Sequence, residues 1–153
     1  KLNFFLKDSY ELILVFLQFF IISLHFFQWE LLPQKQIVQV SPLSYLTGIL
    51  IIIFSLIIML VAIKDLGRNL SPFPRPMKNS NLVTSGIYRI TRHPMYYSLI
   101  FISFGVFIIK LSIYHLFSTI SLALIIKFKI ILEEQYLNNK FKNYLLYKNE
   151  VKY

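Results

Sequence analysis

The residues best suited to chemistry lie in one short stretch, Thr84-Ser-Gly-Ile-Tyr-Arg-Ile-Thr-Arg-His-Pro-Met-Tyr-Tyr97. It places Arg92 and His93 directly before Pro94, at the entrance to an apolar run that starts at Met95. Proline is favoured at the first position of a helix, because an N–H there has no partner to lose. We therefore expect a helix to begin at this point. Its positive dipole end and unpaired N–H groups, flanked by cations, suit an anionic ligand group.

A second group of candidates is the carboxylate pair Glu133 and Glu134. The apolar residues around it recur near helical spacing and predict an amphipathic C-terminal helix over Ile130–Tyr147. Glu134 falls on the apolar face of that helix and Glu133 at its border. A carboxylate on a buried face is costly unless it meets a cation or a donor. The alternative is a solvated pair beside Lys127 and Lys129.

An unusually apolar chain must position these two groups. Its 153 residues are 56% hydrophobic and 17% aromatic, which fits a single integral membrane domain better than a soluble one. Four spans can be drawn, followed by the C-terminal helix: Tyr10–Phe27, Leu43–Ile63, Met95–Ile109 and Leu111–Ile126. The expected fold is therefore all-α, an integral membrane bundle of about four transmembrane helices plus a C-terminal amphipathic helix.

The domain 1–153 divides into two N-terminal spans (1–63) and a part that carries the candidate site (64–153). The loop 64–94 holds three prolines within five residues and is expected to be extended but packed. The last two spans meet at Lys110-Leu111-Ser112 and predict a tight helical hairpin. That hairpin returns Glu133 and Glu134 to the side where Arg92 and His93 lie.

The charge of the chain is strongly asymmetric. The net charge is +9, yet only Lys35 and Lys110 fall at the predicted hairpin tips, which leaves 14 of the 16 basic residues on the other side. The positive-inside rule then predicts a multi-pass protein of the cytoplasmic membrane with both termini cytoplasmic. The basic surface would face anionic headgroups, so nucleic acid is not expected as a partner.

Several kinds of site are excluded or disfavoured. The chain has no cysteine and no Gly-x-Gly-x-x-Gly loop, which excludes disulfides, thiolate ligands and a Rossmann domain. Its histidines are too scattered to predict a metal site, and we expect His115 to be a hairpin-tip or packing residue and His25 an interfacial one. Lys148, near the C-terminus, is expected to be solvated.

If the hairpin brings the two groups together, they form one pocket at the membrane surface. The carboxylates would suit an ammonium or a sulfonium, the cationic donors a carboxylate, and the tyrosines a stacked base. S-adenosylmethionine carries all of these groups together with ribose hydroxyls. The residues thus point to this cofactor.

The same residues also form a recognisable pattern. Gly86-x-Tyr88-x-x-x-Arg92-His93-Pro94-x-Tyr96, followed by Glu133-Glu134-x-x-Leu137-x-x-x-Phe141-x-x-Tyr144-x-x-Tyr147, resembles the isoprenylcysteine carboxyl methyltransferase family. The likeness is greatest to its small bacterial members, which are related to phospholipid N-methyltransferases, and covers about residues 64–153. Two positions depart from the family pattern, because Ser98 and Lys142 stand where glycines are usual.

The resemblance implies a pocket for S-adenosylmethionine that the C-terminal helix closes, while a lipophilic acceptor enters from the bilayer. The residues that it implies for contact with the cofactor are Tyr88, His93, Pro94 and Tyr96. It also implies that Glu133 and Glu134 hold charged or hydroxyl groups of the cofactor, or brace Arg92.

The predicted function is methyl transfer from S-adenosylmethionine to a lipophilic or membrane-embedded carboxylate, thiol or amine. A carboxylate or thiolate needs no base, so alignment and desolvation would supply most of the rate. Arg92 is expected to orient an acidic acceptor or the cofactor carboxylate, and an amine acceptor would need Glu134 or His93 as base. The alternatives are a membrane reductase of the sterol-reductase-like type using NADPH, and a non-catalytic membrane protein whose basic loop binds headgroups.

Overall fold

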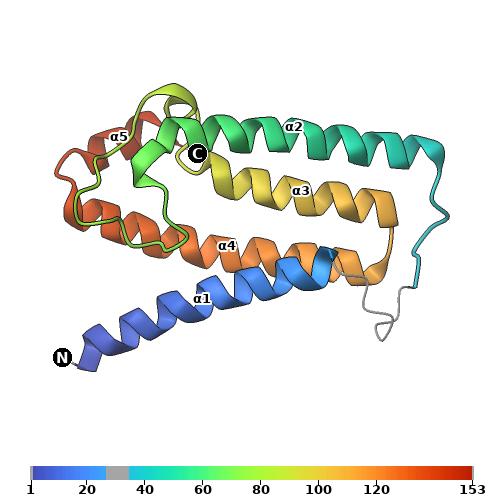
Figure 1. Cartoon of the computed structure of the whole chain (residues 1–153), viewed down its shortest axis with the longest axis horizontal. Helices are drawn as coiled ribbons and strands as arrows, with labels where there is room; N and C mark the ends of the chain where they lie inside the picture. Colours follow the sequence, from blue (N-terminus) through green and yellow to red (C-terminus); the bar gives the residue numbers. More distant parts are fainter. Residues whose placement is uncertain (1, 27–34, 153) are drawn as a thin grey trace.

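The computed structural model describes residues 2–26 and 35–152 and is all-α (Figure 1). Its α-helices are α1 (Leu2–Phe26), α2 (Pro42–Leu66), α3 (Pro94–Lys110), α4 (Ile113–Lys140) and α5 (Tyr144–Glu150). Two 3₁₀ turns, η1 (Gly67–Asn69) and η2 (Gly86–Arg89), lie between α2 and α3. The described residues contain no strand beyond an isolated β-bridge between Gln36 and Ser112. The predicted all-α class is confirmed.

The four long helices run lengthwise beside one another, with α3 against both α2 and α4, and α1 against α4 (Figure 1). The α3–α4 turn and the start of α2 lie at one end of the bundle. The N-terminal end of α1, the α2–α3 loop and α5 lie at the other end. The predicted first span ended at Phe27, which lies outside the described residues, as do Lys1 and Tyr153.

Helix α3 begins where the sequence predicts. Pro94 occupies its first turn and His93 is the residue before it, in a non-helical conformation. The helix ends at Lys110, where Leu111 adopts the left-handed conformation with a φ of 43°. Ser112 then starts α4, because its side chain accepts a hydrogen bond from the backbone N–H of His115. The predicted tight hairpin is confirmed.

The predicted boundary between the fourth span and a separate C-terminal helix is wrong. Helix α4 runs unbroken through Lys127 and Lys129 to Lys140, because lysine is a good helix former and no glycine or proline interrupts the segment. The chain turns only at 141–143, before the short helix α5. Lys142 does not prevent this turn, since Leu111 is the only non-glycine among the described residues with a positive φ.

Two glycines explain the close packing of α2 on α3. A Cβ added to Gly48 would lie 2.7 Å from the carbonyl oxygen of Gly105, and one added to Gly105 would lie 2.9 Å from that of Gly48. Small residues that let backbones approach are typical of helix contacts inside membranes. Ser98 is accommodated in α3 because its hydroxyl donates to the Pro94 carbonyl at 2.8 Å.

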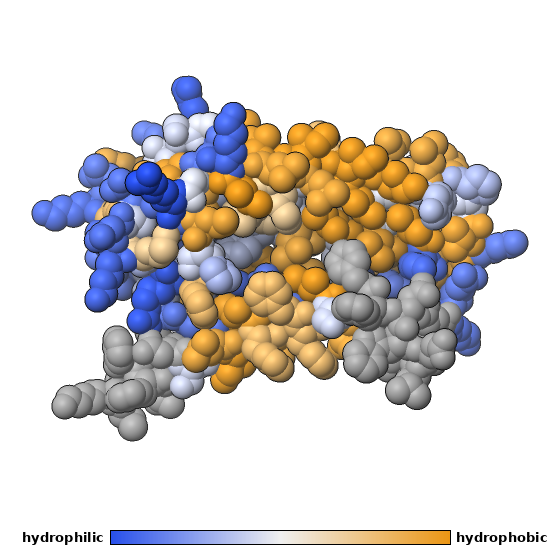
Figure 2. Space-filling model, viewed as in Figure 1, coloured by the Kyte–Doolittle hydropathy of each residue, from blue (hydrophilic) through white to orange (hydrophobic). Residues whose placement is uncertain are grey.

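The surface of the bundle is apolar over its middle. Hydrophobic residues cover the centre of the face shown in Figure 2, and hydrophilic residues gather at the ends, most of them at the end that holds α5. Segments 42–69 and 113–140 are long and apolar enough to cross a membrane, while Ser9–His25 and Pro94–Lys110 are shorter apolar helices. Most of α2 is unburied, with side chains such as Phe54 and Leu60 exposed. Such a surface is too apolar for a soluble monomer.

Two histidines meet at the hairpin end of the bundle. The rings of His25 and His115 lie 5.2 Å apart, and both side chains are buried. Nδ1 of His25 lies 2.5 Å from the Ser118 hydroxyl, and Nε2 lies 3.1 Å from the Ser103 carbonyl oxygen. His25 is therefore packed inside the bundle, and its predicted place at the membrane interface stays a prediction, whereas His115 packs near the hairpin tip as predicted.

Candidate functional site

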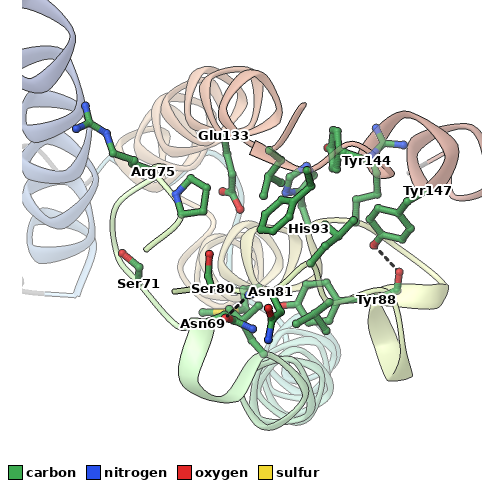
Figure 3. Close-up of a pocket in the computed structure, with 18 of the residues that line it drawn as sticks. Asn69, Ser71, Arg75, Ser80, Asn81, Tyr88, His93, Glu133, Tyr144 and Tyr147 are labelled. Carbon is green, nitrogen blue, oxygen red and sulfur yellow. Dashed lines mark hydrogen bonds between the residues drawn. The ribbon is translucent and has the colours of Figure 1, made fainter. Parts of the chain in front are cut away.

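A cavity opens at the end of the bundle where α3 begins, under α5 and the α2–α3 loop (Figure 3). Its empty volume, which includes space open to solvent, is about 830 Å³. The structure brings the two predicted groups of residues together here. The predicted residues that line the cavity are Tyr88, Arg92, His93, Tyr96 and Glu133.

Gly86 makes the approach to this cavity possible. It has a φ of +62°, which favours glycine, and an added Cβ would lie only 2.1 Å from Oδ2 of Asp65. The same carboxylate accepts the backbone N–H of Ile87 at 2.8 Å. Asp65 therefore ties the end of α2 to the start of η2, and η2 delivers Tyr88 to the cavity wall.

Arg92, His93 and Glu134 form one ion-pair network. Nη2 of Arg92 lies 2.9 Å and Nε2 of His93 lies 3.2 Å from Oε1 of Glu134, while Nζ of Lys148 lies 2.6 Å from Oε2. The side chains of Arg92 and Glu134 are only 12% and 14% exposed. Glu134 thus braces Arg92, which was one of the roles expected for it, and does not line the cavity.

This network corrects two expectations. Glu134 does not depend on a cofactor for a compensating cation, because Arg92, His93 and Lys148 of the chain itself surround it. Lys148 was expected to be merely solvated, yet it is part of the network although its side chain is 43% exposed.

The guanidinium of Arg92 also holds the C-terminal segment. Its Nη1 donates to the backbone carbonyls of Val151 and Lys148. Beside it, the hydroxyl of Tyr147 donates to the Tyr88 carbonyl at 2.6 Å, and burial raises the pKa of Tyr147 to about 12, so this donor keeps its proton. These contacts fix α5 over the cavity. Arg92 is consequently engaged by the chain and acts as a positioning residue.

Glu133 is the carboxylate that faces the cavity. It extends from α4 toward the middle of the space, opposite Ser80 and Asn81 (Figure 3). Its hydrogen-bond partner is the hydroxyl of Tyr96. No basic side chain of the described residues pairs with Glu133 at ion-pair distance, although His93 is close enough to act on it electrostatically. Glu133 is therefore open to the cavity, whereas Glu134 is paired with Arg92.

Tyr144 is a further site residue, and its place among apolar residues at helical spacing gave no sign of a polar role. It lines the cavity and is 1% exposed, and its hydroxyl has no hydrogen-bond partner among the described residues. A buried polar group without a partner costs free energy and calls for an explanation. A ligand group in the cavity would provide the missing partner.

The α2–α3 loop supplies a polar wall that was also not predicted. Its lining side chains are Asn69, Ser71, Arg75, Ser80 and Asn81. The amide oxygen of Asn69 accepts the backbone N–H of Asn81 at 3.1 Å, which closes the loop on itself. The signal that could have revealed this wall was the density of amides, hydroxyls and prolines between two spans.

Comparison with known proteins gives one match. The model of the phospholipid methyltransferase family matches residues 43–144. No curated protein and no solved structure matches the chain. The matched segment runs from α2 to the start of α5 and includes both halves of the site. The chain therefore belongs to the membrane-bound phospholipid methyltransferase family, which includes isoprenylcysteine carboxyl methyltransferase-like proteins.

Proposed function

We propose that this protein transfers a methyl group from S-adenosylmethionine to a lipophilic acceptor. One observation carries the proposal: the cavity holds a carboxylate with no cationic partner at ion-pair distance and a buried hydroxyl with no partner among the described residues, and these groups suit a ligand with a cation and a polar group. Both arginines that line it are already paired, Arg92 with Glu134 and Arg75 with Glu11. Glu133 and the orphaned hydroxyl of Tyr144 remain for a ligand.

S-adenosylmethionine fits this donor set. Glu133 would hold its ammonium or a ribose hydroxyl, and the Tyr144 hydroxyl would bond to a polar group of the cofactor. The rings of Tyr88, Tyr96 and His93 offer faces for the adenine, and His93 and Tyr96 already stack with centroids 5.8 Å apart. Once bound, the cofactor supplies a methyl group that the positive charge on its sulfur activates.

The chain itself supplies alignment and a dry cavity. Arg92 and Tyr147 hold α5 in place over the site, and such exclusion of water strengthens electrostatic interactions inside it. A carboxylate or thiolate acceptor then needs orientation but no base. For an amine acceptor the base would be His93, which lines the cavity, whereas Glu134 does not line it and is paired with Arg92 and Lys148. The acceptor enters from the apolar belt of the bundle.

The proposal includes four membrane crossings with both termini cytoplasmic. Lys110 ends α3 and the Lys35 carbonyl accepts from Ile113 at the start of α4, so both lysines lie at the hairpin end, whereas the candidate site lies at the opposite end together with the basic α2–α3 loop. Helix α3 has 17 residues, the short end of the range for a crossing helix of about 17–25 residues. This arrangement supports a site at the cytoplasmic surface of the membrane.

Calorimetric titration of the detergent-purified protein tests the proposal. We expect binding of S-adenosylmethionine and none of NADPH. Glu133→Gln should weaken the binding about 10- to 150-fold, since a hydrogen bond to a charged group contributes roughly 1.5–3 kcal/mol. Glu150→Gln, an exposed carboxylate outside the cavity, is the matched control and should leave the affinity unchanged. Binding of NADPH instead, or no binding of S-adenosylmethionine, would overturn the proposal.

A further inference from the structure

Helix α1 lies outside the segment that matches the family, yet its inner face carries polar residues at regular intervals. Glu11, Gln18 and His25 follow one another at seven-residue spacing, and they are 5%, 9% and 3% exposed. Seven residues make almost two helical turns, so the three side chains share one face. Buried polar groups in an apolar helix are costly and require partners.

Helix α4 provides those partners in antiparallel order. The hydroxyl of Tyr136 donates to Glu11, the ammonium of Lys129 donates to the amide oxygen of Gln18, and the Ser118 hydroxyl lies at hydrogen-bond distance from His25. The polar residues of α1 thus set its register on α4.

Glu11 and Lys129 also bind the α2–α3 loop, which forms part of the cavity wall. Nε and Nη2 of Arg75 lie 3.2 and 2.9 Å from Oε1 of Glu11. Nζ of Lys129 donates to the carbonyl of Pro72 at 3.0 Å. Residues 71, 73, 75 and 76 line the cavity, so α1 fixes this part of the α2–α3 loop through one direct ion pair and one bridging lysine.

Lys129 also contacts Tyr96, one of the residues that line the cavity. It is 1% exposed, and its Nζ lies 5.4 Å from the ring centroid of Tyr96, at the distance of a cation–π contact. Glu133 lies one helical turn after Lys129. It accepts the hydrogen bond from Tyr96, and the positive charge of Lys129 acts on its carboxylate. The position of the Lys129 ammonium therefore affects the loop and the two side chains at the same time.

We propose that α1 is a positioning element of the cofactor site, with Gln18 acting through Lys129. The inference rests on the proposed function insofar as the cavity is taken to hold S-adenosylmethionine. Gln18 completes the environment of a buried ammonium. Without its amide oxygen the ammonium moves toward other acceptors, which releases Pro72 and disturbs Tyr96.

Cysteine labelling tests the positioning of the loop independently of any ligand. The chain has no native cysteine, so Ser71→Cys reports on the loop next to Pro72. Gln18→Leu in that background should raise the labelling rate about tenfold, whereas Gln18→Glu, which keeps an oxygen for Lys129, should leave it near the parent value. Leu14→Ala is the packing control, because Leu14 is 4% exposed on the same helix and is apolar.

The binding arm measures the consequence for the site. Gln18→Leu should raise the Kd for S-adenosylmethionine about tenfold, whereas Gln18→Glu should keep the Kd of the parent protein. Leu14→Ala should lower the unfolding midpoint without changing the Kd. Equal labelling of parent and Gln18→Leu, or equal effects of Leu14→Ala and Gln18→Leu on labelling, would overturn the inference about α1. If the parent protein binds no S-adenosylmethionine, the proposed function fails, and the labelling arm still decides the role of Gln18.

Discussion

Tyr144→Phe should make the ligand-free protein more stable and its cofactor binding weaker. The substitution removes one hydroxyl and keeps the ring, which is 1% exposed and packs in a cluster with Tyr147 and Val151. In the ligand-free protein that hydroxyl has no partner among the described residues. Its removal therefore takes away a cost and creates no cavity of significant size.

The magnitude follows from the cost of an unpaired buried polar group, about 1–3 kcal/mol. The unfolding free energy of ligand-free Tyr144→Phe should rise by that amount. Binding of the cofactor gives the hydroxyl its partner in the parent protein, so the variant loses about the same free energy of binding, roughly a 5- to 150-fold higher Kd. With saturating cofactor the two proteins should be about equally stable, because the two effects cancel around the thermodynamic cycle.

The assay is unfolding in detergent, followed by circular dichroism, together with calorimetric titration of S-adenosylmethionine. Tyr147→Phe is the matched control from the same helix. Its hydroxyl has a partner, the Tyr88 carbonyl at 2.6 Å, so its loss should destabilise the ligand-free protein by about 1–3 kcal/mol. The reasoning is refuted if Tyr144→Phe is less stable than the parent without ligand, or if it binds the cofactor equally well.

Three further outcomes are expected. Glu134→Gln should lower the unfolding free energy by about 3 kcal/mol in denaturant titrations, because it leaves the largely buried guanidinium of Arg92 without its carboxylate; an unchanged midpoint would contradict this role. Gly86→Ala should reduce stability and cofactor affinity together, since its Cβ would meet Asp65 at 2.1 Å, and equal behaviour to the parent would refute the argument. In intact cells, an impermeant thiol reagent should label Lys35→Cys and spare Lys78→Cys, and the reverse pattern would invert the proposed topology.

The bundle could be predicted from the sequence because each of its signals is local. Apolar runs revealed the helices, and Pro94 together with the short Lys110-Leu111-Ser112 connection gave the start of α3 and the hairpin. The end of α4 could not be predicted in the same way. Its apolar character fades after Ile126, but a helix ends where its backbone hydrogen bonds end, and these continue to Lys140.

The site could be predicted only at the level of which segments meet. The pattern predicted Glu134 on the apolar face and Glu133 at its border, but it could not show that Glu133 is the carboxylate that faces the cavity. That choice depends on Arg92 and Lys148, which approach Glu134 from the start of α3 and from α5. The burial of Lys129 could not be predicted either, because its partner Gln18 is 111 residues away in the chain.

The long separation of these partners has a consequence for biogenesis. Helix α1 is synthesised before α4, while Glu11, Gln18 and His25 find their α4 partners at sequence separations of 125, 111 and 93 residues. In the proposed topology, α1 would enter the membrane before α4 is made, with three polar side chains still lacking their partners. Helix α1 therefore completes these hydrogen bonds only after α4 has been made, and its stable placement depends on α4.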